Sequence, residues 1–493
     1  MFNFGTSIWK FMRKSITFVR SLQATGKFLL TINTVFYLEK RTKTYQRGSI
    51  SYRMFKSYTR FFHDRIYYRR TYTINAANIP KPGIPLMIVS NHQNCLNDAA
   101  GILFSLRDRK PYFIMRADVF DYHPILNKFF RGLGLLPAFR IAFEGVEALH
   151  KNTDTFKQST QELYNGSTLV MFPEAGHQEK RRLNDFTFGF TKMAFEAAAI
   201  GDFDKEIFIL PSCNHYSDYF QLQEQILIKY GTPISLKPFY DLYQSKPRTA
   251  QRQLSALVRK QIETLMLDIR DLDNYEAIHF IRNTYGKKFA SYHLYDSEIL
   301  PDRLLSDRLL VAGLEKNKAE GKEEVLAKLY ADALTLSQGM NEMKINDDLF
   351  DRCPSWVTIG GRLLLLLLLL PLWVFSLWPN ALHLITPNIL INRMTDKMFY
   401  GTFILAISLV VTIPILYTLT FVLAWVYTNI WWALIYLISL PRLGLFAWYY
   451  RLFFIRTIQA LRFQVNLKTK RINDLSKLRK DMIDGLDVLL MNK

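Results

Sequence analysis

Short apolar runs alternate with amphipathic segments between residues 71 and 240. Apolar runs of about four to eight residues, bounded by turn signals, are typical of buried strands. Strands that alternate with helices predict an α/β fold, in which a mixed, mostly parallel sheet is covered by helices. In such sheets binding sites gather at the carboxyl ends of the strands. The predicted strands lie within 84–90, 110–119, 167–176, 206–216 and 226–234, and a helix is predicted within 185–201.

Two long stretches near the C-terminus contain no charged side chain. One runs from Leu363 to Asn392 and the other from Met398 to Pro441. About 20 residues of α-helix cross the hydrocarbon of a bilayer. Each stretch is therefore long enough to be a transmembrane helix, and the second also has room for a re-entrant or interfacial helix. A buried helical hairpin in a soluble protein is the less favoured alternative.

The segments around these regions are basic or charged. Residues 1–70 mix aromatic side chains with Lys and Arg, and they predict amphipathic helices. Such helices either lie on an anionic bilayer or pack on their own domain. Residues 241–355 predict a charged helical region, residues 356–450 the transmembrane region, and residues 451–493 a basic helical tail.

The charge balance of the chain is strongly basic. Its 493 residues carry a formal net charge of +20 at pH 7. This favours a polyanionic partner, either nucleic acid or an anionic membrane surface. The basic residues are spread among many aromatic ones, and the sequence has no helix-turn-helix, zinc-finger or RNA-recognition signature. We therefore expect membrane lipids as partners and no nucleic acid.

A His and an Asp follow the first predicted strand, in the stretch SNHQNCLNDAAG. On a continuous helix an offset of six residues would point His92 and Asp98 roughly 120° apart. They can meet only if His92 lies in the turn and Asp98 in the first turn of the helix. A His–Asp pair suits general-base catalysis, because the carboxylate orients the imidazole and stabilises its protonated form.

Other interpretations of this stretch stay open at this point. Taken alone, an asparagine that caps the helix beside an incidental His is the more common situation. A metal site would need a third ligand, such as His177 or His215, and is less favoured. The three cysteines are widely spaced without a Cys-x-x-Cys motif, so no disulfide framework or zinc site is expected. Cys95 as a nucleophile is the least favoured interpretation.

Further motifs follow in a fixed order. GLGLLPAFR ends at Arg140, MFPEAGHQEKRRL contains Glu174, and ILPSCNHY contains Pro211. Together with the His–Asp motif, over roughly residues 70 to 235, they resemble the glycerolipid acyltransferase family. Members of that family acylate glycerol-3-phosphate or lysophosphatidic acid. The apolar region that follows a helical segment resembles a bacterial, multi-span membrane branch of the superfamily.

The resemblance implies that residues 71–240 form the catalytic domain of an O-acyltransferase. His92 would be the general base on the acceptor hydroxyl, oriented by Asp98, and this hydroxyl would attack an acyl thioester directly. Acyl-CoA or acyl-carrier protein would be the co-substrate, without a cofactor or metal. For Arg181 and Arg182 a basic rim of the surface is an equal alternative to substrate contact. The residues implied for the acceptor site are Arg140, Glu174, Gly176, His177, Arg181 and Arg182, and Pro211 would shape the acyl-site wall.

The sequence departs from the family's pattern at several positions. The commonest spacing would place the carboxylate at Asn97, which is the alternative to Asp98. Ala175 stands where Gly is expected, and Gly176 and His177 stand where Thr and Arg often follow. An acceptor without a phosphate, such as an amino-acid-derived lipid, therefore stays open.

We expect an integral membrane acyltransferase of phospholipid biosynthesis in the bacterial inner membrane. Basic residues interrupt every apolar stretch near the N-terminus, unlike in a signal peptide. Basic regions on both sides of the apolar segments favour a cytoplasmic catalytic domain and an even number of crossings, most simply two. The competing classes are a non-catalytic membrane scaffold or lipid-binding protein, and a hydrolase of soluble substrates that uses the same His–Asp pair.

Overall fold

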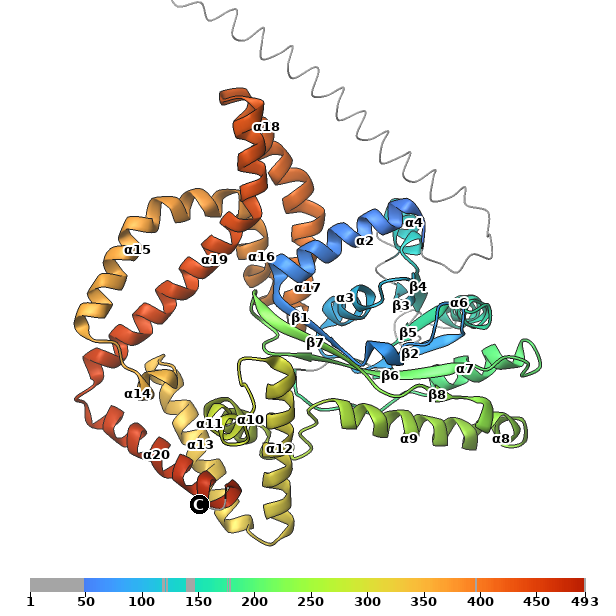
Figure 1. Ribbon diagram of the computed structural model, residues 1–493, viewed down its shortest axis with the longest axis horizontal. Helices are drawn as coiled ribbons and strands as arrows, with labels where there is room; N and C mark the ends of the chain where they lie inside the picture. Colours follow the sequence, from blue (N-terminus) through green and yellow to red (C-terminus); the bar gives the residue numbers. More distant parts are fainter. Residues whose placement is uncertain are drawn as a thin grey trace, which may run out of the picture.

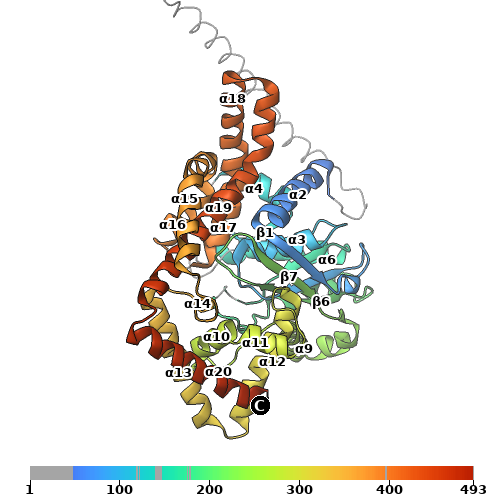
Figure 2. The same ribbon diagram turned by 60° about the vertical axis from the view of Figure 1, so that its left-hand side comes forward.

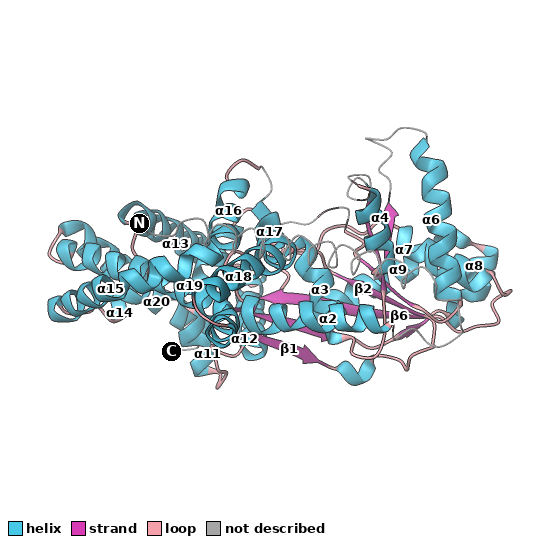
Figure 3. Ribbon diagram, turned by 90° about the horizontal axis from the view of Figure 1, so that it is seen from above, coloured by secondary structure: helices cyan, strands magenta, loops and turns pink. Residues whose placement is uncertain are grey.

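The computed structural model describes residues 48–117, 120, 123–138, 147–174, 176, 179–394 and 397–491. Most of the predicted N-terminal amphipathic segment lies outside these residues. Its last part is helix α2 (Ile50–Phe62), which is capped by the Ser49 hydroxyl. Strands gather in one half of the molecule, whereas α13 (Glu323–Met343), α15 (Trp356–Leu377) and α20 (Lys470–Leu490) lie at the other end (Figure 3).

In the described part of the chain, eight strands form one mixed sheet, in the order β1-β7-β6-β2-β5-β3-β4 with β8 paired to β6 (Figure 1). Neighbours along this order are parallel except β6 and β7, and β8 is also antiparallel to β6. The predicted α/β class with a mostly parallel sheet is therefore confirmed. The strands are β1 (Tyr68–Ile74), β2 (Leu86–Ser90), β3 (Tyr112–Arg116), β4 (Leu135–Ala138), β5 (Thr168–Met171), β6 (Phe208–Tyr216), β7 (Glu224–Tyr230) and β8 (Ile234–Ser235).

Helices cover both faces of the sheet. Every residue of β2 is buried, as expected for a strand with helices on its two sides. Ile88 packs in the same buried cluster as residues of α3, and Met87 packs in the cluster formed with α7 and α9. The covering helices are α3 (Cys95–Ser105) and α2 on one face, and α6 (Glu147–Tyr164), α7 (Gly189–Ala199) and α9 (Pro247–Leu265) on the other. Short helices α4 (Pro124–Gly132) and α8 (Tyr240–Ser245) flank them.

The charged region after the sheet is helical, as predicted. It contains α10 (Tyr275–Thr284), α11 (Gly286–Tyr292), α12 (Leu300–Ala319), α13 and α14 (Asp348–Asp351). Helix α20 from the C-terminal tail packs into the same hydrophobic cluster, through Ile472, Met482 and Leu486. The predicted boundary at residue 240 does not follow the packing, since α9 lies after it and belongs to the core of the sheet domain.

Among the described residues, three apolar helical stretches are long enough to cross a membrane (Figures 1 and 2). They are Trp356–Ile391, Lys397–Tyr427 and Ile430–Asn466. The sequence predicts two such stretches. The difference arises at Asn429, whose side chain accepts hydrogen bonds from the backbone N–H groups of Trp431 and Trp432 and starts a new helix. That helix continues past the predicted boundary at residue 450 because the basic residues after Pro441 are also helical.

Kinked elements make up these stretches. Internal prolines lie within α15, α16 (Ala381–Ile391) and α19 (Ile430–Asn466). Helices α17 (Tyr400–Ile407) and α18 (Thr418–Tyr427) are joined by the π-helix η7 (Ser408–Tyr417), which also contains a proline. Helix α18 and the first part of α19 form a hairpin that rises away from the sheet (Figure 2).

Candidate active site

The two turns that carry the main candidate residues lie side by side. Strands β2 and β5 are parallel neighbours, with Val89 opposite Met171, so their carboxyl ends meet at one edge of the sheet. His92 follows β2 and Glu174 follows β5. The Glu174 carboxylate joins the turns, because its Oε1 accepts a hydrogen bond of 2.7 Å from the backbone N–H of His92.

His92 and Asp98 are in direct contact. Nδ1 of His92 lies 2.9 Å from Oδ2 of Asp98. His92 lies in the turn before α3 and Asp98 in the first turn of that helix, which is the arrangement their spacing requires. The Asp98 side chain is fully buried, whereas 22% of the His92 side chain is exposed. The pair therefore has a buried, fixed carboxylate and an imidazole that reaches the surface.

Hydrogen-bond donors surround the Asp98 carboxylate. Oδ2 also accepts from the backbone N–H groups of Gln93 at 2.8 Å and Asn94 at 2.7 Å. Oδ1 accepts from the Tyr216 hydroxyl at 2.6 Å. Burial, followed by the negative charge of Asp98, raises the pKa of Tyr216 well above its ordinary value. This hydroxyl therefore stays protonated and donates a hydrogen bond to the carboxylate. These groups all donate, which matches a carboxylate, whose oxygens accept hydrogen bonds.

Asn97, the alternative partner for the histidine, faces elsewhere. Its Nδ2 lies 3.4 Å from the Tyr67 hydroxyl and 3.3 Å from Oδ1 of Asn94. The structure brings Asp98 to His92, and the catalytic role of either residue stays a prediction.

The His92 ring is held on two sides. It stacks on Phe172, with 4.5 Å between ring centroids and 20° between planes. When Nδ1 donates to Asp98, the neutral ring carries its lone pair on Nε2. This is the tautomer that a general base needs in order to accept a proton at Nε2.

Glu174 is buried between backbone donors. Its second oxygen, Oε2, accepts from the backbone N–H of Asn184 at 2.8 Å. Burial raises the pKa of Glu174 to about 7, although the hydrogen bonds from Asn184 and His92 act in the opposite direction. Its side chain holds the histidine turn in place, a role that the sequence pattern does not distinguish from substrate contact.

The structure describes only some of the other predicted residues. Arg140, His177 and Ala175 lie outside the described residues. Gly176 is exposed, and a Cβ added there would meet no atom within 4 Å. Pro211 is buried in β6 opposite Val89 of β2.

The two predicted arginines differ in exposure. Arg182 is half-buried, whereas Arg181 is 2% exposed. Nη2 of Arg181 donates to the carbonyl oxygens of Tyr216 at 2.8 Å and Ser217 at 3.4 Å, and the guanidinium lies 5.1 Å from the centre of the Tyr219 ring. Arg181 thus supports the end of β6, the strand that carries Tyr216, and it does not form part of an exposed basic rim.

A C-terminal apolar helix contacts the helix that carries Asp98. The backbone N–H of Leu96 donates to the Thr402 hydroxyl of α17 at 3.2 Å. Gly401 lies against Asn97 and Tyr67, and a Cβ at Gly401 would come within 2.5 Å of the Tyr67 hydroxyl oxygen. The sequence does not predict this contact, nor those of Tyr216, Phe172 and Arg181, since none of them is local in the chain.

Part of the chain is similar to a known protein family. Residues 70–214 match the family model Acyltransferase. Glycerol-3-phosphate O-acyltransferase 2 of Saccharomyces cerevisiae is 24% identical over 135 residues, which are 27% of this chain and 18% of the yeast protein. The crystal structure of PlsC, the 1-acyl-sn-glycerophosphate (LPA) acyltransferase of Thermotoga maritima, aligns with 50% of this chain and 92% of its own, at 18% identity and a TM-score of 0.34. The family match covers most of β1 to β6 and both turns of the site, so this part of the chain is similar to the acyltransferase family.

Proposed function

We propose that the protein is a membrane-bound O-acyltransferase that moves an acyl chain from an acyl thioester to the hydroxyl of glycerol-3-phosphate or a lysophospholipid. The observation that carries the proposal is the 2.9 Å contact between Nδ1 of His92 and the buried Asp98 carboxylate. It lies at the edge of the sheet where the turns after β2 and β5 meet, within the residues that the family model matches. Acyl-CoA or acyl-carrier protein would supply the thioester.

The chemistry follows from the geometry of the pair. Nε2 of His92 removes the proton of the acceptor hydroxyl while the hydroxyl oxygen attacks the thioester carbonyl carbon. The Asp98 carboxylate stabilises the imidazolium that forms. The tetrahedral intermediate then loses the thiolate, which takes the proton from His92. The products are an ester and a free thiol, and the histidine returns to its starting state.

The buried environment makes this base rigid. The backbone donors at Gln93 and Asn94 and the Tyr216 hydroxyl fix the carboxylate, and Phe172 fixes the plane of the imidazole. A pre-organised base loses little free energy to reorganisation during the reaction. The contacts that fix the carboxylate and the imidazole therefore favour a catalytic role for His92 over an incidental histidine beside a helix cap.

Membrane association rests on the three long apolar stretches. At the tip of the hairpin formed by α18 and α19, Trp425, Tyr427, Trp431 and Trp432 are at least half exposed. Aromatic side chains of this kind are enriched at membrane–water interfaces. We therefore place this hairpin across the bilayer, with its tip at the far interface.

The packing of α20 supports an even number of crossings. Tyr285, which lies between α10 and α11, donates a hydrogen bond of 2.8 Å to Asp487 of α20, and Arg479 of α20 pairs with Asp347 at 2.7 Å. Segments before and after the apolar stretches therefore lie on the same side of the membrane. That side would be the cytoplasm of a bacterial cell, where acyl thioesters are available.

The test is an acyl-transfer assay with the purified, detergent-solubilised chain. The donor would be radiolabelled acyl-CoA or a carrier protein that bears the radiolabelled acyl chain. Each donor would be incubated with glycerol-3-phosphate, lysophosphatidic acid or a lyso-amino-lipid. We expect His92→Ala to lower kcat by about 10²–10⁴-fold, the usual contribution of a general base. The exposed His293 offers a matched control, and His293→Ala should retain activity.

The acceptor that gains the label decides between functions. Ester formation on a phosphate-containing acceptor supports the proposal. Label only on the amino-lipid would show that the acceptor is an amino-lipid without a phosphate. Release of free fatty acid with water as sole acceptor would identify a hydrolase. Equal product from the wild type and His92→Ala would contradict the general-base role.

A further inference from the structure

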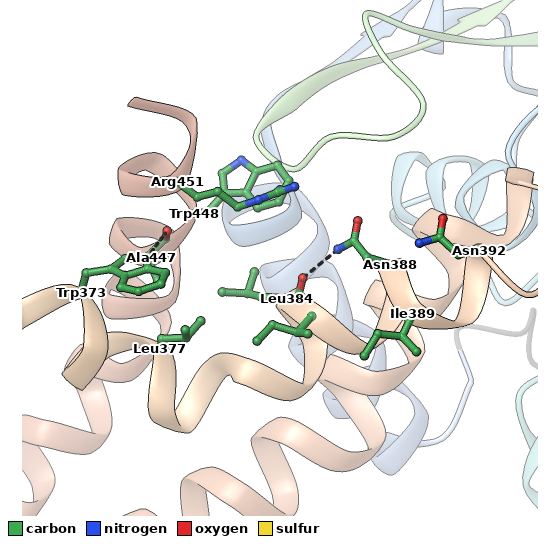
Figure 4. A pocket seen from close by; sticks show the side chains of 10 residues that line it. Trp373, Leu377, Leu384, Asn388, Ile389, Asn392, Ala447, Trp448 and Arg451 are labelled. Carbon is green, nitrogen blue, oxygen red and sulfur yellow. Dashed lines mark hydrogen bonds between the residues drawn. The ribbon is translucent and has the colours of Figure 1, made fainter. Parts of the chain in front are cut away.

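A cavity of about 350 Å³ lies between α15, α16 and α19 (Figure 4). It is separate from the turns that carry His92 and Glu174, and it lies within the apolar stretches. Its volume is in the range of small-molecule and cofactor sites. Its lining has one polar end and one apolar side, the pattern of an amphiphilic ligand.

The polar end is formed by Arg451, Asn388 and Asn392. No carboxylate lies within 4 Å of the Arg451 guanidinium among the residues that the structure describes, and this guanidinium lies 5.3 Å from the centre of the Trp448 ring. Arg451 is exposed and lies in the basic part of α19, at the edge of the cavity, so its guanidinium is accessible to an anionic group there. Its planar guanidinium suits a phosphate group, which it can bind through two parallel hydrogen bonds.

The apolar side is formed by Trp373, Leu377, Leu384 and Ile389. The indole N–H of Trp373 donates to the carbonyl oxygen of Ala447 at 3.2 Å, so the ring offers only its apolar surface to the cavity. Ile389 is 49% exposed, so the cavity continues into an exposed apolar surface. In a membrane this surface faces lipid chains, and a chain that starts in the cavity can extend along it.

We propose that this cavity binds one anionic glycerophospholipid of the surrounding bilayer. Its phosphate lies at Arg451 and the two asparagines, and an acyl chain lies along Trp373, Leu377 and Leu384. Charge complementarity selects the anionic headgroup, since a zwitterionic lipid would bring its own cation to the guanidinium. The proposal rests on the proposed membrane location, and it does not depend on acyl transfer at His92.

The site is mechanically connected to the acyltransferase domain. Leu384 belongs to the same buried cluster as Ala100 of α3 and Tyr400 of α17. Helix α19 also contacts the domain directly, because the Tyr449 hydroxyl donates to Oε1 of Gln223 at 3.0 Å. A lipid between α15, α16 and α19 would therefore brace the helices that hold α3, which carries Asp98.

The test measures lipid retention on the full chain in neutral detergent micelles by native mass spectrometry. Dioleoyl phosphatidylglycerol and dioleoyl phosphatidylcholine have the same chains and differ in headgroup, which is anionic in the first and zwitterionic in the second. We expect one phosphatidylglycerol to be retained, with roughly tenfold preference over phosphatidylcholine, as charge-assisted hydrogen bonds to a phosphate allow. Arg451→Gln should remove this preference.

Two further variants test whether the loss of preference is specific to the cavity. Arg456→Gln is the matched control, because Arg456 is exposed on the same helix but does not line the cavity. Ile389→Trp fills the cavity, keeps Arg451 and should abolish retention of both lipids. Variants are compared only if they elute as the wild type does in size-exclusion chromatography.

The outcomes separate this proposal from the proposed function. Equal retention of both lipids by the wild type, or an unchanged preference in Arg451→Gln, would overturn the lipid site. A chain that is purified from the cytosol without detergent would instead overturn the membrane location. Acyl transfer by a protein without lipid preference would leave the proposed function standing and remove the lipid site alone.

Discussion

The Tyr216 hydroxyl donates a hydrogen bond of 2.6 Å to Oδ1 of Asp98. The two residues are far apart in the chain, and they meet because β6, which ends at Tyr216, lies beside β2 in the sheet. The remaining oxygen of Asp98 binds His92 and two backbone N–H groups. Tyr216 is therefore a positioning residue, which acts on His92 through the carboxylate.

Removal of the Tyr216 hydroxyl should slow the reaction with little change in KM. A hydrogen bond to a charged group contributes about 1.5–3 kcal/mol, so Tyr216→Phe should lower kcat roughly tenfold by loosening Asp98. Steady-state kinetics on the identified acceptor provide the measurement. Tyr68→Phe is the matched control, because the buried Tyr68 hydroxyl has no hydrogen-bond partner in the described part of the chain and its removal should be neutral or slightly stabilising. A rise in KM alone would place Tyr216 in substrate binding.

The choice between Asp98 and Asn97 can be tested by paired substitutions. Asp98→Asn puts an amide NH₂ among groups that are all donors, so we expect kcat to fall by about 10²–10⁴-fold. Asn97→Ala should change kcat by less than about threefold, because the Asn97 amide is directed to the Tyr67 hydroxyl and to Asn94. If Asn97→Ala were the more damaging change, the pair proposed as the base would be wrong.

The local parts of this site are predictable from the sequence. Strand β2 and helix α3 follow from an apolar run and a helical pattern that meet at a short turn. The contact between His92 and Asp98 needs only that turn, since both residues lie within it or within the first turn of α3. Local periodicity and turn chemistry are sufficient for such an element.

The non-local parts follow from the order of the strands, which periodicity does not contain. Tyr216 reaches Asp98 only because β6 neighbours β2, and Arg181 is buried only because it contacts the end of the same strand. The position of Arg181 in a basic run of the sequence therefore does not predict whether it lies on the surface or in the interior. The helix break at Asn429 is similar, because a single capping side chain interrupts an uncharged stretch.

Glu174 should make the stability of the fold depend on pH. Its pKa is raised to about 7 in the folded state, above its ordinary value of 4.5, so the protonated form stabilises the fold. This contribution is fully present below about pH 4.5 and is lost as the pH rises to about 7. The shift corresponds to about 3 kcal/mol. The apparent Tm of the wild type in detergent should fall between pH 5 and pH 8 more than that of Glu174→Gln.

The exposed Glu179 in the same loop provides the comparison for this pH dependence. Glu179→Gln should keep the wild-type slope of Tm against pH. Glu174→Gln should also have a lower Tm at pH 5, because its NH₂ group faces a backbone N–H of His92 or Asn184. Parallel slopes for the wild type and Glu174→Gln would show that Glu174 does not titrate in this range.

The contact between α17 and α3 should be sensitive to a single methyl group. A Cβ at Gly401 would overlap the Asn97 amide and the Tyr67 hydroxyl, so Gly401→Ala must push α17 away from α3. Overpacking of this kind costs about 1–3 kcal/mol, and the displaced α3 carries Asp98. We therefore expect a lower Tm in detergent together with a lower kcat. Gly361→Ala is the control, because a Cβ there meets no atom within 4 Å and alanine favours the helix. If both substitutions behaved alike, the apolar helices would be anchors only, without influence on the site.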